Sequence, residues 1–313
     1  MDALSRNQIA DALESVSCDL CGADDAVPVR LLRDRMFATT DEVFRLVRCR
    51  RCGLLYLNPR PPTSDVDRYY RDDYAPFARR GLAARVKTLT FEREVAGLWP
   101  LLAPPARVID VGCATGELLR AVRGRGNPNV LGIEPSDGAA KIARQRRLLD
   151  VITGTLEAAK LPSGSVHTAL LSHTAEHLPS PSGTFAELHR VLRPDGSVVL
   201  WVPNAASLAA RVLGEWWIGY DAPRHFYTFT PATLSRALSQ QGFAVRSIRH
   251  EWIGLEWSWA LRLWLRDRSP GSRLNTIVGA LHPALTAAFT PAAAFAAMAK
   301  QGGRIRVVAQ RVD

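Results

Sequence analysis

Short apolar segments alternate with helix-like segments between residues 106 and 250. The expected strands are 107–111, 129–133, 151–153, 166–171, 197–202 and 243–248, and the expected helices are 117–124, 137–147, 183–192 and 231–241. Strands separated by helices of about 10–15 residues form right-handed β-α-β units, whose parallel sheet is covered on both faces. The pattern therefore predicts an α/β fold with a Rossmann-like, doubly wound, mostly parallel sheet.

Four of the five cysteines form two CxxCG pairs ahead of this region, Cys18 with Cys21 and Cys49 with Cys52. A gap of two residues lets both thiolates of a pair reach one ion, and the glycine that follows permits a tight backbone turn. Two such pairs supply four sulfurs and predict a closed, structural zinc site that takes no part in catalysis. The alternative is a set of unligated or redox-active thiols.

Composition limits the class of protein. A chain of 313 residues with 47% hydrophobic and 22% charged residues is typical of a globular protein, which excludes a disordered or collagen-like chain. The formal charge of +10 comes from scattered arginines, which reflect either codon usage or attraction to an anionic membrane, lipid or nucleic acid. The few cysteines and the absence of a signal-peptide pattern in residues 1–16 favour a cytoplasmic protein, either free or peripheral on the inner face of the cell membrane.

A glycine-containing turn follows the first expected strand. Its residues are Asp110, Gly112, Cys113, Ala114 and Gly116. Glycines let a ligand approach the backbone, and the helix after the turn directs free N–H groups at that ligand. Glu134 ends the second expected strand, where a carboxylate can accept hydrogen bonds from ribose hydroxyls. Because doubly wound sheets bind ligands at the carboxyl ends of their strands, these residues predict a nucleotide-type site.

The glycine-containing turn, Glu134 and a later loop resemble motifs of the class I S-adenosylmethionine (SAM)-dependent methyltransferases. Asp110-x-Gly112-x-Ala114-x-Gly116 is similar to their first motif, and 133–136 is similar to their ribose-binding turn. Residues 192–197 are similar to the stretch before their fifth strand. The glycine spacing differs from the GxGxxG of dinucleotide enzymes, which disfavours an NAD-dependent dehydrogenase. The resemblance implies SAM as the cofactor and a last strand, 304–313, that pairs antiparallel with the sheet.

The same resemblance implies individual contacts to SAM. Asp110 would face the amino end of the methionine, and Pro135 would follow the ribose acid. The adenine would lie near Thr155 and Leu156, and Ser172 and His173 would flank the cofactor. The family usually has an acid at the position of Thr155, so the adenine amino group needs another partner, either Glu157 or a main-chain carbonyl.

His173, Glu176 and His177 form an H-x-x-E-H pattern at the end of the fourth expected strand. Zinc proteases use this pattern, but they need both histidines on one helix face, so we exclude that function. Three roles remain open. In the first, Glu176 caps a helix while His177 packs against the sheet. In the second, His177 acts as an acid or base. In the third, Glu176 and His177 bind a second, divalent metal with His225, as a similar motif does in some small-RNA and quinone O-methyltransferases.

His225 lies in the loop before the expected helix 231–241, where acceptor-binding loops gather in this fold. Its neighbours Tyr220, Asp221 and Arg224 are suited to orient an imidazole or to hold an anionic acceptor. A histidine whose pKa is near the working pH suits removal of a proton from an acceptor hydroxyl. We expect His225 to be the catalytic base, and the alternative is a histidine that braces the loop.

A narrower resemblance covers more of the chain. The paired cysteines, residues 58–61, the SAM domain and 219–226 resemble a bacterial methyltransferase subgroup with an N-terminal four-cysteine zinc-binding module, whose relatives methylate sugars or quinone precursors. It implies O-methylation of a glycan-linked, lipid-linked or quinone-like small-molecule acceptor. The expected segments are a zinc-binding module (1–62), a helical linker (63–105), a SAM-binding core (106–254), a hydrophobic helical insert (255–303) and the last strand of the core (304–313).

Two other functions compete with this interpretation. An RNA methyltransferase would use the zinc module and the positive charge to hold phosphates. Its basic residues would form a stripe, whereas those of this chain are scattered, so we expect no nucleic-acid partner. A non-catalytic zinc-ribbon adaptor with a degenerate SAM fold is disfavoured by the intact Gly112, Gly116 and Glu134.

The insert has an unusual composition. Four tryptophans and four arginines lie between 252 and 273, and residues 274–299 contain no Asp, Glu, Lys or Arg. This length suffices to cross a bilayer, but Pro283 and Pro291 interrupt it, and the return of the last strand places both ends on one side. We therefore expect an interfacial helical hairpin that contacts a membrane surface through residues 255–300. A homodimer interface, a lid over an apolar acceptor and an ordinary covered helical pair are the alternatives.

Overall fold

The computed structural model describes residues 13–70, 82–252 and 254–312. Its large sheet has seven strands in the order β10-β11-β8-β7-β4-β5-β6. These are β4 (Val108–Val111), β5 (Val130–Glu134), β6 (Val151–Thr153), β7 (Val166–Ser172), β8 (Leu192–Pro203), β10 (Phe243–Glu251) and β11 (Arg304–Arg311). The strands from β8 to β6 are parallel, and β11 runs antiparallel between β8 and β10. The predicted Rossmann-like sheet with an antiparallel last strand is confirmed.

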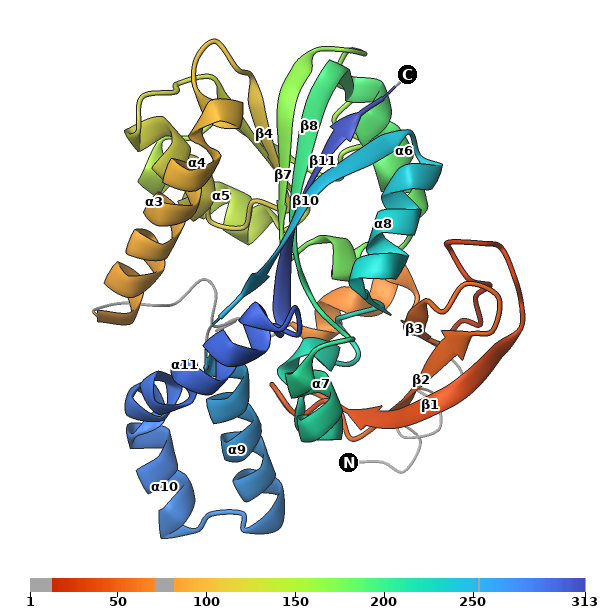
Figure 1. Cartoon of the computed structure of the whole chain (residues 1–313), viewed down its shortest axis with the longest axis vertical. Helices are drawn as coiled ribbons and strands as arrows, with labels where there is room; N and C mark the ends of the chain where they lie inside the picture. Colours follow the sequence, from red (N-terminus) through yellow and green to blue (C-terminus); the bar gives the residue numbers. More distant parts are fainter. Residues whose placement is uncertain (1–12, 71–81, 253, 313) are drawn as a thin grey trace.

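Helices cover both faces of this sheet, as Figure 1 shows. On one face lie α3 (Leu82–Leu102), α4 (Glu117–Gly124) and α5 (Asp137–Arg147), and on the other lie α6 (Pro181–Val191) and α8 (Pro231–Gln240). Each face buries its own apolar cluster, because β-strands point alternate side chains to opposite faces. Burial on both faces also explains why these strands read as nearly continuous apolar runs.

The first turns of two helices show which local sequence signals determine where a helix begins. The predicted helix 137–147 is exact, because the Ser136 hydroxyl accepts a hydrogen bond from Ala139 N and caps the helix. The predicted helix 183–192 was wrong at its start. Ser180 caps that helix and Pro181 occupies its first turn, where a missing N–H costs no hydrogen bond.

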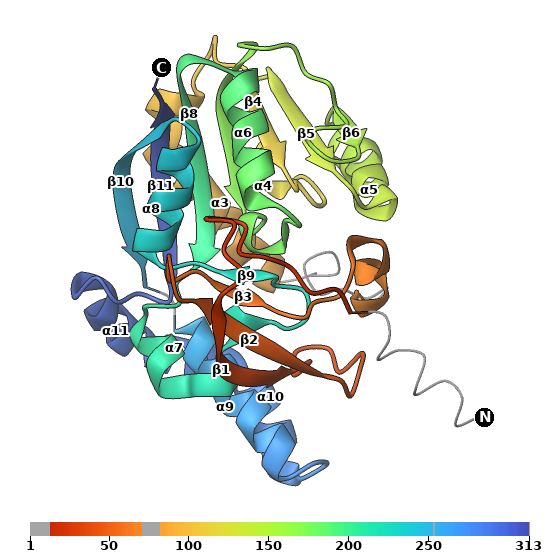
Figure 2. The ribbon, with the colours of Figure 1, turned by 90° about the vertical axis from the view of Figure 1, so that its right-hand side faces the viewer.

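A second, smaller sheet lies at the end of the large sheet (Figure 2). It has the antiparallel order β1-β2-β3-β9, with β1 (Ala26–Arg33), β2 (Val43–Cys49), β3 (Leu55–Leu57) and β9 (Tyr227–Thr228). Neither β1 nor β9 was predicted from the sequence. Since β9 begins two residues after His225, its pairing with β3 brings the loop that carries this histidine to the cysteine-containing region.

The chain also forms several short helices outside the two sheets and their covering helices. They are η1 (Thr63–Tyr69), η2 (Ala175–His177), α7 (Leu208–Leu213), η3 (Gly214–Trp216) and η4 (Ile218–Tyr220). Residues 1–12 of the expected zinc module and 71–81 of the expected linker lie outside the described residues. The division into five segments stays a prediction.

The insert forms three helices, α9 (Leu255–Arg268), α10 (Arg273–Ala280) and α11 (His282–Met298). Glu251 and Pro203 both pair with Arg304, so the chain enters and leaves the insert at the end of the large sheet where β8 finishes. Figures 1 and 2 show the insert projecting from that end. Within the described ranges, no single helix has the length and apolar composition of a membrane span, whereas α10 and α11, bent by 67°, meet those criteria as a pair.

Candidate functional site

Asp110 and Glu134 lie at the same edge of the large sheet. Asp110 in β4 pairs with Gly132 in the parallel strand β5, so Glu134 extends two residues beyond it. Asp110 is buried, and its Oδ1 has no hydrogen-bond partner within the described parts of the chain. Burial, together with the negative charges of Glu134 and Glu117, raises the pKa of Asp110 well above its ordinary value. A buried carboxyl group without a counter-charge is suited to receive a cationic group.

The turn after β4 depends on a left-handed backbone. Gly112, Ala114 and Gly116 have φ angles of 73°, 50° and 77°. A Cβ atom at Gly112 would lie 2.6 Å from the Thr174 hydroxyl oxygen, and one at Gly116 would collide with Leu149. Only glycine fits these two positions, which confirms that the turn packs closely against η2 and α5.

Glu134 fastens the turn to the second strand. Its Oε2 accepts a hydrogen bond from Ala114 N at 2.8 Å, and its Oε1 accepts one from Ser136 N at 2.9 Å. Burial raises the pKa of Glu134, and these two hydrogen bonds partly oppose that increase. Each carboxylate oxygen has a second lone pair, so Glu134 still has acceptor capacity for two ribose hydroxyls. The residues present therefore fit the cofactor that the sequence predicts.

The other residues predicted to contact the cofactor differ in their exposure to solvent and in their hydrogen bonds. Cys113 is buried, with Sγ close to Gly132, whereas Pro135 is exposed. Thr155 is exposed and its hydroxyl accepts from Ala158 N at 3.3 Å, and Leu156 is buried in the core. Glu157, the alternative adenine partner, accepts a hydrogen bond from the Thr184 hydroxyl at 2.8 Å. The roles assigned to these residues, and to Ser172 at the end of β7, stay predictions.

A cluster of polar side chains lies directly beside the turn. The Thr174 hydroxyl donates to Val111 O at 2.9 Å and holds η2 against β4. Glu176, in η2, is fully buried, and its Oε1 lies 3.2 Å from Nδ1 of the exposed His173. Because Ser180 caps α6, the interpretation of Glu176 as a helix cap was wrong. Instead, Glu176 turns inward, and its Oε2 has no partner within the described residues.

His177 and His225 meet in this cluster, although 47 residues separate them. Their ring centroids are 4.5 Å apart in an edge-to-face arrangement. Ligand atoms of Glu176, His177 and His225 all lie within 4.8 Å of one another. The fold therefore brings together two histidines that the sequence placed in separate motifs.

Hydrogen bonds fix the tautomers of both histidines. Nδ1 of His225 lies 2.9 Å from Gly219 O, and Nδ1 of His177 lies 3.0 Å from Arg224 O and 3.1 Å from the Tyr70 hydroxyl. A carbonyl only accepts, so we assign the proton to Nδ1 in both rings, which leaves Nε2 with a lone pair. Burial, with the nearby His225, lowers the pKa of His177 to about 4, so this imidazole is neutral at pH 7.

Glu176 complements the two imidazole rings. Burial alone would raise its pKa, but the hydrogen bond from His173 and the charges of the three surrounding histidines lower it to about 2. His177 is neutral at pH 7, so its charge does not contribute there. The cluster thus combines an ionised carboxylate with two imidazole lone pairs, which suits either proton transfer or binding of a cation.

Arg224 does not play the role expected of it. It is 1% exposed and pairs with Asp34 at 2.6 Å and with Asp221 at 2.7 Å. Its charge is already balanced, so the expectation that it holds an anionic acceptor was wrong. Asp221 lies 3.9 Å from Nε2 of His225, too far for a hydrogen bond, and Gly219 O orients the ring instead.

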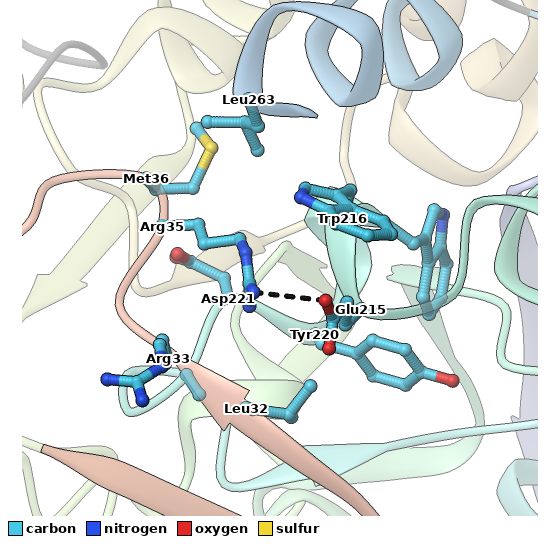
Figure 3. A pocket seen from close by; sticks show the side chains of 11 residues that line it. Leu32, Arg33, Arg35, Met36, Glu215, Trp216, Tyr220, Asp221 and Leu263 are labelled. Atoms are coloured by element: carbon cyan, nitrogen blue, oxygen red, sulfur yellow. Dashed lines mark hydrogen bonds and ion pairs between the residues drawn. The ribbon is translucent and has the colours of Figure 1, made fainter. Parts of the chain in front are cut away.

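A small pocket lies between the small sheet and the insert, next to Asp221 (Figure 3). Arg35 on one wall forms an ion pair with Glu215 on the other at 3.2 Å, and its guanidinium lies 5.5 Å from the ring centroid of Trp216. Leu263 of α9 adds an apolar wall. The pocket shares Asp221 with the loop that carries His225, so it borders the histidine cluster.

The four predicted metal-binding cysteines lie together at one end of the small sheet, ahead of β1 and at the turn between β2 and β3. Cys18 Sγ is 3.4 Å from Cys52 Sγ, and Cys21 Sγ is 3.5 Å from Cys49 Sγ. All four sulfurs lie within 4.8 Å of one another. Tetrahedral zinc with Zn–S bonds of about 2.3 Å places its sulfurs about 3.8 Å apart, so the donor set fits a closed zinc site.

Comparison with known proteins agrees with this geometry. A family model described as a methyltransferase domain matches residues 78–248. The chain is 30% identical over 151 residues to malonyl-[acyl-carrier protein] O-methyltransferase of Serratia marcescens, which covers 48% of this chain and 56% of that enzyme. It is 29% identical over 165 residues to ubiquinone biosynthesis O-methyltransferase of Pseudomonas aeruginosa, covering 49% of this chain and 68% of that enzyme. The chain thus spans little more than half of the first relative.

Solved structures share the fold. One is a putative sarcosine dimethylglycine methyltransferase from Galdieria sulphuraria, with a TM-score of 0.51, 13% identity, and coverage of 78% of this chain and 92% of that one. Another is a SAM-dependent methyltransferase from Archaeoglobus fulgidus, with a TM-score of 0.50, 18% identity, and coverage of 72% and 94%. The family model takes in 171 of the 313 residues, more than half of the chain, and the protein therefore belongs to this methyltransferase family.

Proposed function

We propose that the protein is a SAM-dependent O-methyltransferase that acts on a small hydroxylated acceptor. The observation that carries the proposal is the pair of buried carboxyl groups at the ends of β4 and β5. Oδ1 of Asp110 has no hydrogen-bond partner among the described residues, and Glu134 offers free acceptor capacity beside a left-handed glycine turn. This arrangement matches a ligand that has an amino group at one end and a ribose in the middle.

Different residues would bind different parts of SAM. Asp110 would receive the amino group, because an opposite charge offsets the cost of ionising a buried carboxyl group. Glu134 would accept both ribose hydroxyls, and the N-terminus of α4 would lie beside the ligand. When bound, SAM supplies an electrophilic methyl group on its sulfonium. What this chain must add is alignment of the acceptor and removal of the acceptor proton.

The histidine cluster is suited to remove that proton. Nε2 of His225 has a lone pair, and its Nδ1–H is held by Gly219 O, so the ring is fixed in the tautomer of a base. His177 lies against it in the same tautomer. General-base catalysis of this kind contributes roughly 10²–10⁴-fold in rate. We therefore keep both histidines as the proposed catalytic residues, with His225 as the base.

A second candidate mechanism is favoured by one specific feature. Both histidines donate Nδ1–H to a main-chain carbonyl, which is how metal-binding histidines are commonly oriented. Oε2 of Glu176 is buried and has no partner in the part of the chain that the structure describes. Glu176, His177 and His225 would then hold a divalent cation that polarises the acceptor oxygen. The four cysteines of the small sheet would hold a separate, structural zinc ion.

The relatives suggest the class of acceptor. The two curated relatives are named for malonyl-acyl carrier protein and for ubiquinone biosynthesis. We propose a glycan-linked, lipid-linked or quinone-like acceptor.

Calorimetry with SAM tests the first step, because binding needs no knowledge of the acceptor. We expect wild-type protein to bind SAM and Asp110→Asn to bind it more weakly. Transfer of a labelled methyl group to fractionated envelope lipids and sugar nucleotides then tests the reaction. Folded, zinc-loaded wild-type protein that shows no heat of SAM binding would refute the proposed function.

A further inference from the structure

The insert exposes several large apolar side chains to solvent. Leu274, Ile277 and Leu281 are 50%, 52% and 50% exposed, and Phe295 and Met298 are 70% and 77% exposed. The spacings of three and four residues place these side chains along one side of each helix. Large apolar side chains this exposed, in a contiguous segment, mark a surface that contacts a partner.

The buried sides of these helices show which way the apolar surface points. Val278 of α10 and Ala293 and Ala296 of α11 are buried, and both helices pack against α9. The exposed apolar side chains therefore face away from α9 and from the protein. No Asp, Glu, Lys or Arg occurs from 274 to 299, so this outward surface is uncharged along its whole length.

Basic residues flank the apolar stretch in the chain. Arg273 begins α10 and Lys300 follows α11, and α9 carries Arg262, Arg266 and Arg268. The guanidinium of Arg268 lies 5.8 Å from the ring centroid of Trp264, which is 39% exposed. Asp267 is the one acid between 257 and 300, and it already pairs with Arg35 at 2.7 Å. Residues 257–300 therefore have a net positive charge.

We propose that α10 and α11 dock on the surface of an anionic lipid bilayer. An uncharged, apolar helix face with a basic residue at each end, here Arg273 and Lys300, is suited to lie in a membrane interface with the apolar side chains below the headgroups. Each basic residue near an anionic surface adds about 1 kcal/mol of attraction. A second copy of this chain fits less well, because a symmetric contact would bring Arg273 and Lys300 of both copies together with no acid from 268 to 300 to balance them.

The topology agrees with an interfacial position. Glu251 and Arg304 are paired neighbours at the two ends of the insert, so the insert leaves and rejoins the sheet on the same side. The carboxyl ends of the parallel strands lie at this end as well, so docking would bring the histidine cluster toward the bilayer. The inference needs only the surface of the insert and does not depend on the proposed enzymatic function.

Flotation with vesicles tests the proposal. The full chain is mixed with phosphatidylcholine vesicles that either contain or lack phosphatidylglycerol, at low and high salt. We expect the protein to float with the anionic vesicles at low salt and less so at high salt, because the screening length falls from about 30 Å at 0.01 M salt to about 3 Å at 1 M. The double variant Phe295→Asp, Met298→Asp should bind about tenfold or more weakly, since it loses two inserted side chains.

Leu148→Asp is the matched control. Leu148 is 73% exposed and has a left-handed backbone that aspartate tolerates, and it lies after α5, outside the insert. This variant should bind anionic vesicles as wild-type protein does. The proposal is overturned if wild-type protein stays with the buffer, if both variants lose binding equally, or if sedimentation velocity shows a dimer that Phe295→Asp dissociates while no protein floats.

Discussion

The guanidinium of Arg224 donates to both carboxylate oxygens of Asp34, at 2.6 and 3.2 Å, and neither side chain is exposed to solvent. Asp34 follows β1 of the small sheet, and Arg224 directly precedes His225. The pair therefore joins the cysteine-containing sheet to the loop that carries the proposed base. The small sheet is thus part of the structure that positions the histidine cluster.

Breaking this pair should destabilise the protein strongly. Asp34→Asn removes one of the two carboxylates that face Arg224. Because Asp221 still balances the arginine, we expect a loss near the lower end of the about 3–5 kcal/mol that breaking a buried ion pair costs. Urea unfolding at pH 7 measures this change in the free energy of unfolding. Glu187→Ala is the control, because its pair with Arg190 is partly exposed and is worth about 1 kcal/mol or less. Equal losses in the two variants would contradict the role assigned to the buried pair.

The pH dependence of stability should reflect Glu256. Burial raises the pKa of this carboxyl group, which accepts a hydrogen bond from Trp217 Nε1 at 2.9 Å, to about 7. A folded-state pKa above the ordinary value of 4.5 means that the folded protein binds the proton more tightly. The stabilisation is therefore full below the unfolded-state pKa and is lost as the pH rises through 7, by no more than about 3 kcal/mol.

Glu256→Gln isolates this effect, because glutamine keeps an acceptor for Trp217 and cannot ionise. Urea unfolding of both proteins, from about pH 5 to pH 8, should show a smaller loss of stability with rising pH in the variant. Identical pH profiles for the two proteins would show that Glu256 ionises as freely in the folded state as in the unfolded state.

The parts of the site that the sequence revealed are those encoded locally. Asp110 and the glycine turn end one strand, and Glu134 ends the next strand along the chain. Parallel strands bring their carboxyl ends to one edge, so adjacency in the fold follows from the order of elements. The CxxCG pairs were readable for the same reason, since each pair makes a local turn.

The parts that the sequence did not reveal depend on long-range packing. A site shared by His177 and His225 was only one of the three roles left open by the sequence. They meet because β9 pairs with β3, and a strand of two residues leaves too weak a pattern to predict. The partner of Arg224 was missed because Asp34 lies 190 residues away, and nothing in either local segment identifies the other. Charge balance of a buried arginine is a tertiary property, so the sequence suggested a ligand where the fold supplies a carboxylate.

The cysteine site makes a prediction about metal content. Wild-type protein should contain one zinc ion per chain, and Cys49→Ser should lose it and destabilise the small sheet, because three thiolates no longer close the tetrahedron. Atomic absorption measures the metal, and near-ultraviolet circular dichroism measures the packing. Cys113→Ser is the control, since the fifth cysteine lies beside Gly132 and should leave the zinc content unchanged. A zinc-free wild-type protein purified without chelator would contradict this assignment.

Glu134 should govern affinity for SAM. Glu134→Ala removes the acceptor for the ribose hydroxyls and releases the N–H groups of Ala114 and Ser136 that hold the turn. Hydrogen bonds to a charged group contribute about 1.5–3 kcal/mol, so calorimetry should show SAM binding weakened by about tenfold or more. Turnover at saturating SAM should change less than affinity does. Unchanged affinity would place the ribose elsewhere.

His225 should govern turnover. Its ring lies in the histidine cluster, separate from Asp110 and Glu134, so His225→Ala should leave SAM affinity nearly unchanged while turnover on the true acceptor falls by roughly 10²–10⁴-fold.

Metal dependence separates the two candidate mechanisms. If His225 acts as a simple base, a chelator that spares the cysteine-bound zinc leaves wild-type turnover intact. If Glu176, His177 and His225 hold a cation, the same treatment abolishes turnover, and divalent metal restores it in wild-type protein but not in His225→Ala or Glu176→Gln. Wild-type turnover in His225→Ala would exclude both mechanisms, because each requires the Nε2 lone pair that this ring presents.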